Sequence, residues 1–322
     1  MIKPTLEMLN EWSQLGHRNT FGESLVLLGA ENPSVYAIAA DTTSTSRLQN
    51  FKAAYPDRMY DVGIAEQNLI ATGAGLAHEG LLPFVSTLAA FLPMRCAEQM
   101  RVLLGYMNMD VKVVAIEAGV SFGPLSNTHF AMDDIAVVRA IPNFTVIAPA
   151  DPREIYKAVF AAAAHKGPVY IRLAGPAPLR IMYAEDYDFT VGKAVEYRKG
   201  TDVALISTGS MLANAADAAD ILAQMGISAR VINMHTIKPI DTSMLDSVFA
   251  ENKLLVTIEE HTVFGGLGGA VAEYKAGVVD APRQLFCGLK DSFCKVGIYD
   301  YHMDKNGLTA PQIAKLVQQN LL

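Results

Sequence analysis

The stretch FTVIAPADPREIYKAVFAAAAHKGPVYIRLA, residues 144–174, contains a complete strand–helix–strand pattern. Its two ends, FTVIAPA and PVYIRLA, are short apolar runs rich in β-branched residues, which are typical of buried parallel strands. Between them, Asp151 is suited to cap a helix and Pro152 to occupy its first position, and the helical spacing ends at Gly167. We therefore expect two neighbouring strands of a parallel sheet joined by a crossover helix.

The same alternation continues in both directions along the chain. Further strands are predicted at 35–41, 111–119, 202–209, 229–235 and 253–260, with helices at 65–80 and 211–225. Residues 175–200 interrupt this rhythm with Gly, Pro and mixed charge, and are expected to connect two domains. The prediction is an α/β fold of two open, mainly parallel-sheet domains, residues 1–184 and 190–322.

The composition is apolar for a globular protein: 51% of the 322 residues are hydrophobic and 18% are charged. This balance indicates a large buried interface as well as two cores. The chain has no run of about 18 apolar residues that predicts a membrane span, and its start has no signal-peptide pattern. A net charge of -7, from 26 basic and 33 acidic residues, disfavours nucleic acid as a partner.

The three cysteines, Cys96, Cys287 and Cys294, do not have the paired spacing of metal ligands. Their odd, low number without a signal peptide indicates reduced thiols that pack as small apolar residues. We therefore expect a cytoplasmic protein that binds no metal through its own side chains alone.

Two glycine-containing segments have the general character of anion-binding turns. The run GGLGG, residues 265–269, matches neither common phosphate-binding spacing, so a helix start packed closely on a neighbour is favoured over a phosphate cradle. The segment TGS, residues 208–210, lies between a predicted strand and a predicted helix. It is compatible with an anion site at a helix N-terminus or with an ordinary turn and cap.

The segment DVGIAEQN, residues 61–68, leads into the apolar helix LIATGAGLA and places Glu66 at the mouth of a strand-to-helix turn. Burial there would favour a protonated carboxyl group, because a charged acid loses its solvation in an apolar site. An ordinary acidic residue in the first helical turn, favoured by the helix dipole, is the alternative. Spacing alone leaves both interpretations open.

This segment resembles the cofactor-glutamate motif of transketolases and 1-deoxyxylulose-5-phosphate synthases. The resemblance extends from about residue 15 to the end of the chain, and implies a pyrimidine-binding domain followed by a transketolase C-terminal domain. The other similar segments, in family order, are STLAAFLPMRCAEQMRV (86–102), VKVVAIEAGVSFGPLSNTHFAMDDIAVVRAIPNFTVIAPAD (111–151), GPVYIRL (167–173), STGSMLANAADAADIL, INMHTIKPID and VTIEEHTVFGGLGGAVAE.

The resemblance implies a thiamine diphosphate site. Glu66 would hydrogen-bond N1′ of the aminopyrimidine and favour its imino tautomer, and Phe91 would stack against that ring. Asp41 matches an acidic residue near the cofactor, and His129 matches a histidine that contacts substrate oxygens. Arg18 matches a basic residue that helps to hold a substrate phosphate. For Phe91 the alternative is a core phenylalanine, and for Asp41 it is a strand-end turn. For His129 the alternative is a structural histidine, and for Arg18 it is a surface ion pair.

Several positions differ from the usual transketolase pattern. Leu125 stands where an acidic residue commonly contacts a substrate hydroxyl, and Glu117 where a phosphate-contacting histidine is common. A position near Gly175, where many relatives have a phosphate-binding arginine, has no basic side chain. Because a site discriminates against substrates whose polar groups it leaves unpaired, these differences disfavour ordinary pentose phosphates and favour a modified, smaller or less anionic sugar. Other departures are Leu88, Ala97 and Phe130.

The Gly-Asp-Gly motif with which full-length relatives hold Mg²⁺ and the cofactor diphosphate does not occur in this chain. The resemblance therefore implies an N-terminal partner subunit that supplies this site, in an α2β2 assembly. The implied activity is that of a split transketolase, which transfers a two-carbon ketol unit from a ketose to an aldose. The alternatives are a β subunit of a 2-oxo-acid dehydrogenase, a deoxyxylulose-phosphate-synthase-like carboligase, and a non-catalytic binding protein.

Overall fold

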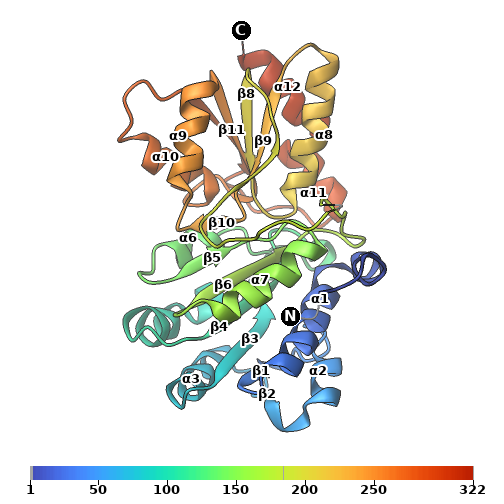
Figure 1. Ribbon diagram of the computed structural model, residues 1–322, viewed down its shortest axis with the longest axis vertical. Helices are drawn as coiled ribbons and strands as arrows, with labels where there is room; N and C mark the ends of the chain where they lie inside the picture. The colour runs from blue at the N-terminus through green and yellow to red at the C-terminus, as the bar shows by residue number, and fades with distance from the viewer. Residues whose placement is uncertain (1–2, 184, 322) are drawn as a thin grey trace.

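The computed structural model describes residues 3–183 and 185–321, which form two stacked α/β units (Figure 1). One unit contains a seven-stranded sheet and the other a five-stranded sheet, and most strand pairs in both are parallel. The predicted fold class is thereby confirmed. No helix in the described ranges combines the length and apolarity needed to cross a membrane.

The first sheet has the order β10-β5-β6-β4-β3-β1-β2, with β10 as its antiparallel member. Helices α1, α2 and α7 pack against one face, and α3, α4 and α6 against the other. The bounds in this unit are α1 (Leu6–Glu31), β1 (Val35–Ala39), α2 (Gln49–Ala54), η1 (Pro56–Arg58), β2 (Met59–Asp61), α3 (Glu66–His78), β3 (Leu82–Leu88), α4 (Leu92–Arg95), α5 (Ala97–Gln99), η2 (Met100–Tyr106), β4 (Lys112–Ala118), η3 (Gly123–Thr128), α6 (Asp134–Arg139), β5 (Thr145–Ile147), α7 (Pro152–Ala164) and β6 (Val169–Ala174).

The second sheet has the order β12-β11-β8-β9-β7, with β7 as its antiparallel member. Helices α8, α11 and α12 cover one face, and α9 and α10 cover the other. The bounds in this unit are β7 (Val195–Arg198), β8 (Val203–Ser207), α8 (Met211–Gln224), β9 (Ala229–Asn233), β10 (Thr236–Lys238), α9 (Thr242–Glu251), β11 (Leu254–Thr262), α10 (Leu267–Lys275), β12 (Arg283–Leu289), α11 (Tyr299–Asn306) and α12 (Ala310–Asn320).

The two halves of the chain are joined by shared strand pairing, which the sequence pattern does not indicate. Strand β10 comes from the second half of the chain but pairs with β5 of the first sheet. Strand β7 lies inside the stretch expected to be a connection, and forms the edge of the second sheet by pairing with β9. The division at 184 and 190 remains a prediction, and β10 shows that the two units share secondary structure across it.

Candidate active site

The segments that follow β1, β2, β3 and β4 leave the first sheet at the same edge. Ala39 of β1 is level with Asp61 of β2 on one side and with Ser86 of β3 on the other. Ser86 is in turn level with Val114 of β4. Because the carboxyl ends of parallel strands meet at one edge, residues far apart in the sequence come together there.

Glu66 is the first residue of α3 and is only 7% exposed. The same helix presents the fully buried Leu69 and Ile70 to the sheet, and this apolar anchoring fixes the helix start. An acid at this position also interacts favourably with the helix dipole. The structure thus shows an acid that is both buried and in the first helical turn, which are the two features that the sequence left as alternatives.

The partner of Glu66 is Arg95, the last residue of α4. Arg95 Nη1 lies 2.7 Å from Glu66 Oε1. The guanidinium carbon of the same side chain lies 4.0 Å from the centroid of the Phe91 ring. Glu66 and Phe91 are therefore bridged by one flat cation that pairs with the acid and covers the aromatic face.

His129 follows η3 and adds a third predicted residue to this cluster. Its ring meets Phe91 edge-on at a centroid distance of 5.3 Å, and Phe122 at 5.8 Å. Its Nδ1 lies 2.9 Å from the hydroxyl oxygen of Thr128. Glu66, Phe91 and His129 thus form one continuous row of contacts, which Arg95 completes.

Asp41 lies in the loop after β1, at the same edge of the sheet, where its backbone is left-handed with a φ of 55°. Its N–H donates to Asp61 Oδ1 at 2.8 Å, and Asp61 also accepts from Gly63 N–H at 3.0 Å and from the Thr43 hydroxyl at 2.7 Å. Partial burial raises the pKa of Asp61, but these three donors outweigh it and hold the pKa below its usual value. Asp61 therefore ties together the loop of Asp41 and the turn that leads to Glu66.

Arg18 lies at the same edge of the sheet but is not a free cation. Its Nε lies 2.8 Å from Glu117 Oε1, and its Nη1 lies 3.4 Å from the Thr45 carbonyl oxygen. Glu117 is almost fully buried at the end of β4. Burial raises the pKa of Glu117, and the neighbouring Arg18 opposes that rise. The charge of Arg18 is therefore largely matched within the protein.

Residues 13–176 match the transketolase pyrimidine-binding domain, and residues 192–303 match the transketolase C-terminal domain. The chain belongs to the transketolase family. It is 36% identical over 302 residues to the 6-deoxy-6-sulfo-D-fructose transketolase subunit SqwH of Clostridium sp. (strain MSTE9), covering 94% of this chain and 93% of that protein. It is 40% identical over 236 residues to an apulose-4-phosphate transketolase subunit of Actinobacillus succinogenes, covering 73% of this chain and 76% of that protein.

A solved structure described as a split gene transketolase, inactive beta4 tetramer, superimposes with a TM-score of 0.87 at 36% identity, covering 95% of this chain and 98% of that one. The 1-deoxy-D-xylulose-5-phosphate synthase of Chlorobium luteolum is 35% identical over 311 residues, but the chain covers only 48% of that enzyme. The chain is thus similar, over nearly the whole length of each protein, to SqwH and to the subunit in the split transketolase structure. Split transketolases are ketol transferases, and the transketolase family depends on thiamine diphosphate.

The second domain of this transketolase subunit supports the loop that carries His129. The buried Glu260 of β11 accepts the N–H of Val120 at 2.8 Å, just after β4. The buried Arg172 of β6 donates to the carbonyl oxygens of Ala131 at 3.3 Å and Glu260 at 2.9 Å, while it pairs with Asp134. The segment on both sides of His129 is therefore fixed by buried charges at the junction between the domains.

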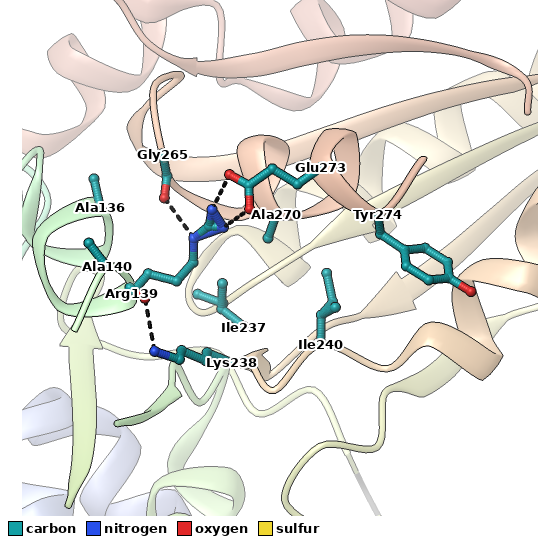
Figure 2. Close-up of a pocket in the computed structure, with 10 residues that line it drawn as sticks. All are labelled: Ala136, Arg139, Ala140, Ile237, Lys238, Ile240, Gly265, Ala270, Glu273 and Tyr274. Carbon is teal, nitrogen blue, oxygen red and sulfur yellow. Dashed lines mark hydrogen bonds and ion pairs between the residues drawn. The ribbon is translucent and has the colours of Figure 1, made fainter. Parts of the chain in front are cut away.

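A large pocket of the transketolase subunit lies elsewhere, between α6, β10 and α10 (Figure 2). It has a volume of about 640 Å³. Arg139 projects into it, pairs with Glu273 and donates to the Gly265 carbonyl oxygen at 3.0 Å, while Lys238 Nζ donates to the Arg139 carbonyl oxygen at 2.9 Å. The charged groups of this open pocket bind one another, and its lining includes none of the predicted site residues.

The glycine-containing segments of the transketolase subunit are occupied by its own carboxylates. Glu259 accepts the N–H groups of Leu267 and Gly268 at 2.7 and 2.8 Å, and a Cβ atom at Gly266 would lie 2.0 Å from its carboxylate. Ser210, before α8, donates to Glu260 at 2.8 Å. The predicted close packing at the start of α10 is confirmed. Within residues 3–183 and 185–321, no group of three or more His, Cys, Asp or Glu is placed to hold a metal ion.

Three residues of the candidate site were not identified from the sequence. Arg95 lies within a segment quoted for its family resemblance, and its position four residues after Phe91 is the helical spacing that brings two side chains together. Asp61 and Phe122 also lie within quoted segments. Only the spacing of Arg95 gave a local signal. The contacts of Asp61 with Asp41 and Thr43 arise where separate strands end, and Phe122 meets His129 through the fold of η3.

Proposed function

We propose that Glu66 and Phe91 hold the aminopyrimidine of thiamine diphosphate, with Asp41 nearby, and that His129 and Arg18 face the sugar substrate. The observation that carries this proposal is the row of contacts from the buried Glu66 through the face of Phe91 to His129. It brings a buried carboxyl group, an aromatic ring and an imidazole to one edge of the sheet.

The chemistry of these groups suits an aminopyrimidine. The Glu66 carboxyl and the Phe91 face are near enough to engage one flat, nitrogen-bearing group together, as they do the guanidinium of Arg95. A pyrimidine ring likewise needs a stacking surface and an acid in its own plane. When bound, thiamine diphosphate supplies the nucleophilic carbon that accepts the two-carbon unit.

The roles of the protein groups follow from their positions. Glu66 holds and exchanges a proton at N1′ of the pyrimidine, shielded from water by α3 and the sheet. His129 contacts Thr128 through Nδ1, so we assign its Nε2 to the oxygen of the substrate carbonyl or hydroxyl. A hydrogen bond there would stabilise the charge that develops on that oxygen.

We propose that the partner subunit binds Mg²⁺ and the diphosphate of the coenzyme, in an α2β2 assembly. The start of α10 already donates a backbone N–H to Glu259, and the Ser210 hydroxyl before α8 donates to Glu260. Several large apolar side chains near the site are exposed, including Ile64 at 80% and Met94 at 60%. Exposed apolar surface of this kind is typical of a subunit interface.

The proposed substrates are a modified or less anionic ketose and an aldose acceptor. Glu117 neutralises much of the charge of Arg18, so its attraction for a phosphate is weakened. Leu125, 45% exposed before His129, offers an apolar contact where a polyol substrate would need a polar one. Two of the relatives are named for a sulfo-sugar and for apulose 4-phosphate, which supports an unusual sugar as the substrate.

The test is reconstitution with an N-terminal transketolase subunit, thiamine diphosphate and Mg²⁺, followed by a screen of sugar pairs for ketol transfer. We expect turnover only from the mixture, and a loss of at least about a hundredfold for Glu66→Gln because proton transfer is removed. Arg101→Gln, at an exposed position in η2, serves as the control. Normal turnover by Glu66→Gln, or decarboxylation without ketol transfer, would contradict the proposal.

A further inference from the structure

Arg95 connects the two groups that we assign to the coenzyme pyrimidine. Its guanidinium pairs with the Glu66 carboxyl at 2.7 Å and covers the Phe91 ring at 4.0 Å. The Glu66 side chain is 9% exposed, whereas the Arg95 side chain is 49% exposed. Arg95 therefore lies on the solvent side of the acid, between it and the outside.

The guanidinium occupies the space that a bound pyrimidine would need. A ring stacked on Phe91 and bonded in its plane to Glu66 must lie just above the phenylalanine face and next to the carboxyl oxygen. Both conditions are already met by the flat cation of Arg95. Two planar groups cannot share that space, since protein interiors are close-packed.

The contact also opposes the proton chemistry assigned to Glu66. An ion pair with a guanidinium requires an ionised carboxylate, and an ionised carboxylate has no proton to donate to a ring nitrogen. In the absence of a ligand, however, Arg95 compensates a charge that would otherwise be buried without a partner, which is strongly unfavourable. The same side chain thus stabilises the buried Glu66 carboxylate and competes with the pyrimidine for the space beside it.

We propose that the Arg95 side chain fills the pyrimidine-binding site between Glu66 and Phe91, and that the coenzyme must displace this side chain in order to bind. This rests on the assignment of Glu66 and Phe91 under the proposed function. The backbone of Arg95 is held, because its carbonyl oxygen accepts a hydrogen bond from Gln67 Nε2 at 3.0 Å. Displacement therefore requires only that the exposed side chain swing outward.

The test is Arg95→Gln in the subunit reconstituted with its N-terminal partner, with binding of thiamine diphosphate and Mg²⁺ measured by calorimetry. We expect the dissociation constant to fall by up to about tenfold, because removing a competing conformation raises the fraction of binding-competent sites. In the free subunit the same variant should melt at a lower temperature, and this loss should vanish in a Glu66→Gln background. Arg101→Gln, whose exposed partner is Glu98, should change neither quantity.

Weaker or unchanged coenzyme binding by Arg95→Gln would overturn the proposal, as would a structure of the loaded assembly in which Arg95 still pairs with Glu66. That structure decides the matter even if the variant folds poorly. Failure of the proposed function has a different signature, because the wild-type assembly would then bind no thiamine diphosphate at all.

Discussion

His129 illustrates how a single side chain is positioned by neighbours both near and distant in sequence. Its ring is fixed edge-on by Phe91 and Phe122, and its Nδ1 by Thr128. We expect His129→Ala in the reconstituted enzyme to lower kcat by roughly 10²- to 10⁴-fold, the usual range for a proton-transfer group. Affinity for thiamine diphosphate should change far less. Comparison of turnover with calorimetric binding checks this, and a larger effect on binding would move His129 out of the substrate site.

His17 makes a prediction about stability rather than catalysis. Desolvation lowers its pKa from 6.5 to about 3, and nearby Arg18 adds to this effect. The unfolded chain therefore binds a proton below pH 6.5 that the folded chain refuses, so the free energy of unfolding falls as the pH drops from 6.5 toward 3. At pH 5.5 the contribution of His17 alone to this loss is about 1.4 kcal/mol relative to neutral pH.

The His17→Gln variant should show an acid-dependent loss smaller by this amount than that of the wild type, whatever its stability at neutral pH. Urea unfolding of the free subunit at pH 7.5 and pH 5.5 measures the difference for each protein. His78→Gln, at an exposed position, should keep the wild-type difference. An equal difference in wild type and His17→Gln would show that His17 is not the group responsible.

At the scale of elements, η3 is held against the second domain by one side chain. The Asn127 amide donates to the Cys294 carbonyl oxygen at 2.7 Å and accepts the Cys294 N–H at 2.9 Å. Ser126, just before it, has a left-handed backbone with a φ of 58°. These contacts position the loop that ends at His129, and they give the C-terminal domain a part in placing that residue.

We expect Asn127→Ala to lower kcat/KM by roughly ten- to a hundredfold, since small displacements of a positioned group are costly to catalysis. Asn214→Ala is the matched control, because its amide donates to the Leu308 carbonyl oxygen within the second domain at 2.8 Å. Each variant removes partly buried hydrogen bonds, two with Cys294 for Asn127 and one with Leu308 for Asn214, so both melting temperatures should fall. If kcat/KM also falls equally, the role of Asn127 is stability alone.

Elements with regular patterns could be predicted from the sequence, and those defined by pairing could not. The helix after Asp151 forms as expected, and the Asp151 side chain accepts the Glu154 N–H at its start. Strand β10 has three residues and no pattern of its own, because it exists only where it meets β5. The kink at Gly16 in α1, with a φ of 81°, likewise depends on packing, since a Cβ atom there would lie 3.0 Å from Ala177.

The same distinction applies to the site. Glu66, Phe91 and His129 were expected together because family motifs mark them, and the structure brings them into one row. For Arg18 an ion pair was the stated alternative, but its partner Glu117 was not expected, because the two residues come from α1 and β4 and meet only when the sheet forms. Pairing between side chains on separate elements thus decides which charges remain free, and no local pattern encodes it.

At the scale of the whole molecule, the site lies on a surface that the chain itself leaves uncovered. Ile64, two residues before Glu66, is 80% exposed, which is unfavourable for a large apolar side chain unless a partner covers it. We expect Ile64→Arg to prevent co-elution with the N-terminal subunit, because a buried unpaired charge is strongly destabilising at an interface. Circular dichroism and the melting temperature of the free subunit should change little, since Ile64 makes few contacts to lose.

Val279, after α10 in the second domain, is the matched control because it is 87% exposed but belongs to the opposite unit from α3 (Figure 1). Val279→Arg should co-elute with the partner and restore coenzyme-dependent turnover as well as the wild-type chain does. If Ile64→Arg still assembles and Val279→Arg does not, the partner covers the second domain instead. The coenzyme would then have its diphosphate held far from Glu66, and the shared site proposed between the two subunits could not form.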